Sequence, residues 1–73
     1  MEIWQNCKKH KSKNYVVITM DFHKDAYKEY HCKTLRESKI IFESLVNSKY
    51  SGEIVVDYIR IVNKKTGKVI EED

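Results

Sequence analysis

The chain has 73 residues, of which 34% are charged and 41% hydrophobic, with no proline and two glycines. This length allows one domain with one small core and excludes a multidomain enzyme with a deep cleft. Frequent Ile and Val, with five Tyr, two Phe and one Trp, argue against a disordered chain. The apolar runs are too short to span a membrane.

The net charge of +3 is distributed unevenly. The first 33 residues contain seven lysines and four acidic residues, whereas the remainder contains seven basic and seven acidic residues. A basic cluster attracts phosphate groups or an acidic protein surface. The candidate contacts for a nucleic acid or an acidic partner are Lys8, Lys9, His10, Lys11 and Lys13. The alternative is a solvated basic loop that keeps the protein in solution.

The two cysteines, Cys7 and Cys32, indicate a compartment. Only two apolar residues follow Met1 before the first lysines, so we expect no export signal. Without export, thiols stay reduced. We therefore predict two free thiols in a cytoplasmic protein.

The first half of the chain contains three candidate strands. Residues 15–22 are the clearest, because Val16, Ile18, Met20 and Phe22 alternate with a more mixed set. Residues 2–8 are a possible earlier strand, joined to it by a lysine-rich hairpin loop at 9–14. Residues 27–33 are interpreted as a third strand after a turn at 23–26, because a helix start follows at Thr34.

A helix is predicted over about 34–48. Thr34 and Glu37 have the spacing of a capping box, in which the Thr hydroxyl accepts a free backbone N–H. At 100° per residue one side of the helix is almost entirely apolar, as a core-facing side should be. That side consists of Leu35, Ser38, Ile41, Phe42, Leu45 and Val46.

Residues 53–62 form the second strong strand, apolar on both sides as in a covered central strand. A turn follows at 63–68, in which Gly67 suits the left-handed position of a bulged hairpin. Residues 68–71 then return as a short edge strand.

The elements predict one α+β domain over residues 1–73, in the order β-β-β-α-β-β, with one helix on one face of an antiparallel sheet. A single helix leaves the other face uncovered, and exposed apolar surface of that extent marks an interface. We assign to this protein interface Trp4, Val17, Val55, Ile59 and Ile61, with Ile40 as an isolated contact on the helix. This face predicts a homodimer or docking on another protein.

Metal binding and catalysis have weak support. The weak metal-ligand candidates are Cys7, His10, His31 and Cys32, but His31 and Cys32 are adjacent and would face opposite sides of a strand. No motif places a thiol beside an imidazole and an orienting group, and no phosphate-binding glycine motif is present. We predict no enzyme activity, no metal and no cofactor.

Nucleic-acid binding is the main alternative to protein binding. Trp4 and Tyr15 flank the lysine-rich loop, and aromatic rings stack on bases while lysines follow phosphates. Against it, the chain has only two arginines and no aromatic signature of an RNA-binding sheet.

With its proline-free composition, its helix start at Thr34-Leu35-Arg36-Glu37 and its hairpin at Thr66-Gly67, the chain resembles many small bacteriophage and mobile-element accessory proteins. The resemblance implies a protein that binds and modifies a host component. We therefore predict a small non-enzymatic binding protein that acts by protein–protein interaction, with nucleic-acid binding through the basic loop as the alternative. A small zinc-binding module is the weakest hypothesis.

Overall fold

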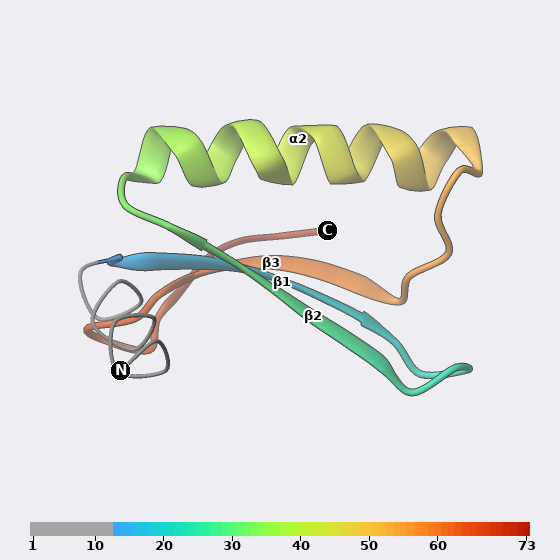
Figure 1. Ribbon diagram of the computed structural model, residues 1–73, viewed down its shortest axis with the longest axis horizontal. Coiled ribbons are helices and arrows are strands. Elements are labelled where there is room, and N and C mark those ends of the chain that lie inside the picture. The colour runs from blue at the N-terminus through green and yellow to red at the C-terminus, as the bar shows by residue number, and fades with distance from the viewer. Residues whose placement is uncertain (1–12) are drawn as a thin grey trace, which may run out of the picture.

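The computed structural model describes residues 13–73, and the predicted first strand at 2–8 lies outside the described residues. Residues 13–73 form a four-stranded antiparallel sheet with one helix above it, which confirms the predicted α+β class (Figure 1). The elements are β1 (Tyr15–Asp21), β2 (Ala26–Cys32), α2 (Leu35–Ser51), β3 (Tyr58–Asn63) and β4 (Val69–Glu72).

The strands lie in the order β2-β1-β3-β4, and every neighbouring pair is antiparallel. Val17 at the centre of β1 faces Tyr30 of β2 on one side and Ile61 of β3 on the other. Both edges of β1 are therefore occupied. The hairpin predicted between residues 2–8 and this strand lies outside the described residues.

Helix α2 begins where the sequence predicts. Thr34 is the N-cap, and its Oγ1 accepts a hydrogen bond from the Glu37 amide at 3.2 Å. The helix continues three residues beyond the predicted end at 48 and stops at Gly52, whose φ of 84° is the left-handed conformation that favours glycine. The Gly52 amide donates to the Lys49 and Ser48 carbonyls, which closes the last turn.

Hydrogen bonds also connect the C-terminal turn of α2 to Asp73, which follows β4. The Asp73 carboxylate accepts hydrogen bonds from Tyr50 Oη at 2.8 Å and from Lys49 Nζ at 3.2 Å. These bonds lower the pKa of Asp73 and raise the pKa of Tyr50. They hold the helix end over the sheet edge.

The core lies between α2 and one face of the sheet. Its fully buried side chains are Val17, Cys32, Ile59 and Ile61. The predicted helix side packs against them, and buried Ser38 satisfies its hydroxyl by donating to the Leu35 carbonyl at 2.6 Å. The predicted orientation of the helix is thus confirmed.

The sequence analysis placed α2 on the wrong face of the sheet. Val17, Ile59 and Ile61, predicted to lie on the uncovered face, are buried beneath α2. The pairing register is the reason. The register places Tyr30 and Cys32 of β2 on the same sheet face as Val17, and these residues add to its apolar surface. The other face of β1 is uniformly apolar, but the β2 residues beside it include polar ones such as Glu29.

The predicted strand at 53–62 is too long at its beginning. Residues 53–57 form the connection from α2 to β3, and the Ile54 amide bonds back to the Ser48 carbonyl at the helix end. Only Asp57 reaches β1, where its amide donates to the Met20 carbonyl. Val55 lies in this connection, and its apolar side chain is 71% exposed because it does not pack on the sheet.

Candidate functional site

Cross-strand pairing defines the sheet face that lies away from α2, which we call the open face. Residues directly opposite in an antiparallel sheet point to the same side. Met20 is opposite both Tyr27 and Tyr58, and Val16 is opposite both His31 and Val62. The open face comprises Val16, Ile18, Met20, Tyr27, Glu29, His31, Tyr58, Arg60, Val62, Val69 and Glu72.

One end of the open face carries an aromatic cluster, formed by Phe22, Tyr27 and Tyr58 around Met20. The rings of Phe22 and Tyr58 contact each other in a tilted arrangement, with centroids 5.9 Å apart. Phe22 is 64% exposed and Tyr27 is 52% exposed. Large aromatic side chains left this exposed on a sheet face are typical of a binding surface.

Arg60 extends this cluster toward β4. Its guanidinium carbon lies 3.9 Å from the centroid of the Tyr58 ring, within the range of a cation–π contact. Its Nε also donates to Glu72 Oε2 at 2.9 Å. Arg60 therefore lies over the Tyr58 ring with its charge balanced by Glu72.

The β1–β2 turn holds Phe22 in place. Asp21 is buried, and its carboxylate accepts hydrogen bonds from the amides of His23 and Lys24. The Phe22 amide donates to the carboxylate of Asp57, which precedes β3. Asp25 closes the turn with a φ of 53°, a left-handed conformation that Asp tolerates better than most residues. The exposed Phe22 ring thus projects from a constrained turn.

A polar row runs beside the aromatic cluster along β2. Tyr27 Oη donates to Glu29 Oε2 at 2.6 Å, and Glu29 Oε1 lies 3.1 Å from His31 Nε2. Lys64 Nζ lies 3.0 Å from His31 Nδ1. The row therefore connects β2 with the β3–β4 turn across the end of β1.

These contacts shift two ionisation equilibria. The carboxylate of Glu29 stabilises the protonated phenol and raises the pKa of Tyr27 to about 12. Conversely, the hydrogen bond from Tyr27, assisted by the one from His31, lowers the pKa of Glu29 below its usual 4.5. Glu29 is therefore a carboxylate at neutral pH that is engaged by two neighbours.

The Cys32 thiol does not belong to the polar row. Cys32 is on the helix side of β2, fully buried, with Sγ donating to the Tyr30 carbonyl. Burial raises the pKa of the Cys32 thiol. Cys32 is a free thiol, as predicted, and His31 and Cys32 project to opposite faces. These two cannot share a metal ion or form a thiol–imidazole pair.

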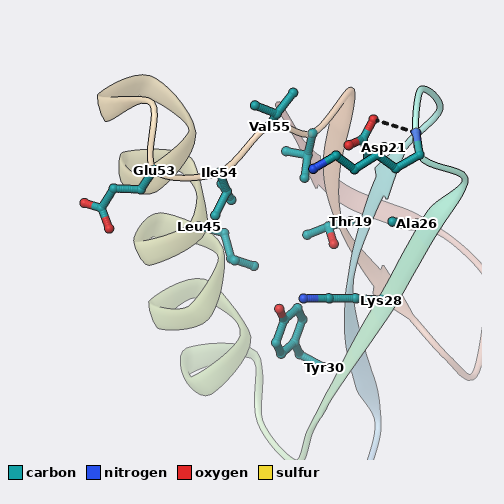
Figure 2. A pocket seen from close by; sticks show the side chains of 11 residues that line it. Thr19, Asp21, Ala26, Lys28, Tyr30, Leu45, Glu53, Ile54 and Val55 are labelled. Atoms are coloured by element: carbon teal, nitrogen blue, oxygen red, sulfur yellow. Dashed lines mark hydrogen bonds between the residues drawn. The ribbon is translucent and has the colours of Figure 1, made fainter.

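A second feature lies on the helix side, where the C-terminal half of α2 diverges from the β1–β2 hairpin. The space between them is a cleft of about 360 Å³. Leu45 and Ile54 point into it from the helix and the following connection, and Lys28 and Tyr30 point into it from β2 (Figure 2). The floor is formed by Thr19 of β1.

The structure separates the residues that the sequence assigned to sites. Trp4, Cys7 and His10 lie outside the described residues, as do Lys8, Lys9 and Lys11. Lys13 is half-buried before β1, Ile40 is 61% exposed on the outer side of α2, and Val55 borders the cleft. Among residues 13–73, no three His, Cys, Asp or Glu side chains are grouped to hold a metal ion.

Sequence reasoning missed the aromatic cluster. Phe22 begins the turn at 22–25, Tyr27 lies near the start of β2, and Met20 is opposite Tyr27 in the hairpin that this turn produces. That pairing could have been inferred from the hairpin alone. The contribution of Tyr58 required the β1–β3 register, which no local pattern contains.

No helix among the described residues has the length and hydropathy needed to cross a membrane. In comparisons with known proteins, no family model matched the chain, and neither a curated protein nor a solved structure showed significant similarity.

Proposed function

We propose that this protein is a non-enzymatic binding protein that docks a protein partner on the open face of its sheet. The observation that carries the proposal is the aromatic cluster, in which Phe22 and Tyr27 are more than half exposed on a rigid strand hairpin. Rigid aromatic side chains bury a large area at a small entropic cost. Aromatic residues and arginine are also enriched in protein interfaces.

The charges of the open face favour a protein over a polyanion. Arg60 is paired with Glu72, and Glu29 is engaged by Tyr27 and His31. The surface around the rings is thus mixed in sign, as the polar rim of a protein interface is. Occupation of a partner's surface, without chemistry, is the mode of action we propose.

Affinity capture with variants tests this function. Wild-type protein should retain a specific partner from the native host, and the purified pair should bind in calorimetry. The double variant Phe22→Ser/Tyr27→Ser should weaken that binding at least roughly tenfold, because exposed aromatic anchors dominate interface energies. Sedimentation of the pure protein shows whether the partner is a second copy of the chain.

Ile40→Ser is the matched control, because Ile40 is equally exposed but lies on the outer side of α2. It should bind as the wild type does. A partner whose affinity falls with Ile40→Ser and is unaffected by the double variant would refute docking on the open face and assign it to the helix.

Single-stranded nucleic acid is the second candidate occupant. The same three rings could stack on bases, and the chain has a net charge of +3. If this is the ligand, log affinity should fall linearly with log salt, and alanine at Lys8, Lys9, Lys11 and Lys13 should abolish binding. Absence of binding to single-stranded DNA and RNA at low salt refutes this candidate.

A further inference from the structure

We infer that the cleft between α2 and β2 is a second docking site, which takes an extended acidic peptide segment of a protein partner as an added strand on β2. This inference does not depend on the open face. It combines three features of the described residues: a free strand edge, an apolar wall beside it, and two lysines at the cleft.

The outer edge of β2 has backbone groups available for pairing. The Met20 and Asn14 carbonyls accept hydrogen bonds from Asp57 and Lys64 on the β3 side. Because backbone groups alternate in direction along a strand, the odd-numbered residues of β1 then bond to β2. Their partners are Ala26, Lys28, Tyr30 and Cys32.

The intervening residues of β2, Tyr27, Glu29 and His31, consequently direct their N–H and C=O groups away from the sheet. Within residues 13–73 no strand pairs with that edge. An extended segment that adds to an exposed edge obtains main-chain hydrogen bonds from such groups, while pockets for alternate side chains supply the specificity.

The cleft supplies a pocket on the correct side of that edge. Lys28 and Tyr30 face the helix and line it, and Leu45 and Ile54 form the opposite wall (Figure 2). A strand added beside β2 would project every second side chain toward this wall. An apolar side chain there would cover Leu45 and Ile54, both of which are half-buried.

The charges select the chemistry of the segment. Lys24 and Lys28 both line the cleft and are exposed, and neither has an ion-pair partner among the described residues. The carboxylate of Asp21 at the cleft end already accepts two turn amides. Glu53 also lines the cleft, but its carboxylate points away from Lys28 (Figure 2) and accepts a hydrogen bond from the Ser51 hydroxyl. Two lysines without ion pairs beside an apolar wall favour a segment that alternates acidic and apolar residues. A second copy of β2 would instead bring another Lys28 to the same edge.

Amide correlation spectra of the full chain provide the test. The probe is a short synthetic peptide that alternates Glu and Val, and the matched control peptide alternates Lys and Val. The Glu peptide should shift the amide signals of Tyr27, Glu29 and His31 and slow their hydrogen exchange. The Lys peptide should leave them unchanged. Unshifted β2 amides up to the solubility limit of the Glu peptide would overturn the proposal.

Charge reversal sharpens the result. Lys28→Glu should weaken binding of the Glu peptide at least roughly tenfold and create binding of the Lys peptide. Lys39→Glu makes the same charge change on the exposed outer side of α2 and should alter neither affinity. Equal losses in both variants would indicate attraction by net charge alone and refute a site at the cleft.

Different variants test the peptide site and the open-face proposal, so either proposal can be refuted without the other. Phe22→Ser changes the open face and should leave peptide affinity at the wild-type value. Lys28→Glu should leave a partner of the open face bound. If Phe22→Ser alone removes peptide binding, the peptide occupies the open face and the cleft proposal is wrong. Circular dichroism of each variant confirms that it retains the fold.

Discussion

Residues at three positions of the chain show how local chemistry sets local structure. Thr34 caps α2 through a single hydrogen bond from the Glu37 amide. Gly52 and Gly67 adopt φ angles of 84° and 73° where the helix ends and where the β3–β4 hairpin turns. The left-handed conformation of Gly67 confirms the prediction for that turn. Such positions tolerate few alternatives because the backbone conformation excludes most side chains.

Removing the helix cap should destabilise the protein measurably. Thr34→Ala deletes the acceptor for the Glu37 amide, and loss of such a cap costs about 1 kcal/mol in free energy of unfolding. Urea denaturation measures the difference. Thr34→Ser keeps the hydroxyl and should stay within a few tenths of a kcal/mol of the wild type. Equal stability of the alanine and serine variants would show that the cap contributes nothing.

The Tyr27–Glu29 hydrogen bond should be visible in the titration of the phenol. Glu29→Gln removes the carboxylate, so the pKa of Tyr27 should fall from about 12 toward its usual 10.0. Carbon NMR of the tyrosine rings follows this titration. Glu72→Gln removes a carboxylate at the opposite edge of the same sheet face and should leave the Tyr27 pKa unchanged.

The sign of the pH effect on stability follows from the same shift. The folded state holds the Tyr27 proton more tightly than the unfolded state, so stability from this bond is present below pH 10 and is lost as pH rises toward about 12. Glu29 acts in the opposite range. Its folded pKa is lowered below 4.5, so its contribution is present above that pH and is lost on acidification.

At the scale of elements, burial depends on which strand faces meet. The β1–β3 register puts Val17 beside Ile61 under α2 and puts Ile18 beside Arg60 on the open face. The side of β1 on the open face is the more uniformly apolar one, but its neighbours include polar residues such as Glu29 and Arg60. A strand thus acquires its inner face from its partners.

Two isoleucines of contrasting burial test this assignment. Ile59 is fully buried between α2 and the sheet, whereas Ile40 is 61% exposed on the outer side of the helix. Ile59→Ala should lower the free energy of unfolding by about 2–5 kcal/mol through lost transfer energy and a cavity. Ile40→Ala should change it by less than about 0.5 kcal/mol. If both variants lost a similar free energy of unfolding in denaturant melts, the assignment of α2 to this sheet face would be wrong.

At the scale of the molecule, the helix and the four strands of residues 13–73 enclose one core. Cys32 lies in that core with Val17, Ile59 and Ile61, and all four are fully buried. We therefore expect the reactivity of its thiol to report on opening of this core.

Thiol labelling measures that opening. In a Cys7→Ser background, Cys32 should react with an aromatic disulfide reagent at least roughly a hundredfold more slowly in buffer than in denaturing urea, because reaction needs an exposed thiolate. Destabilisation by Ile59→Ala should accelerate the native reaction. Equally fast labelling in both solvents would contradict the buried position of Cys32.

The sequence was sufficient for those features that depend on nearby residues. The start of α2, its core-facing side, the strands at 15–22 and 27–33 and the turn at Gly67 all agree with the structure, apart from one residue at strand ends. Each depends on periodicity or capping within a few residues. The helix end was placed three residues early, because the continuing turn is held by Asp73, which is distant in sequence.

The candidate site could be predicted only in part. An uncovered sheet face follows from counting one helix against one sheet, but Val17, Ile59 and Ile61 were assigned to it and belong to the core. The aromatic cluster on the true open face joins Phe22 and Tyr27 to Tyr58, which is over 30 residues away along the chain.

The sequence by itself predicted a small α+β domain with one helix on one face of the sheet, and residues 13–73 have that architecture. Only the tertiary structure decided which face that is. The physical reason is that period-two alternation makes the two sides of a strand distinct but does not say which is inner. That choice depends on the summed apolar surface of four paired strands, and their pairing is a non-local property.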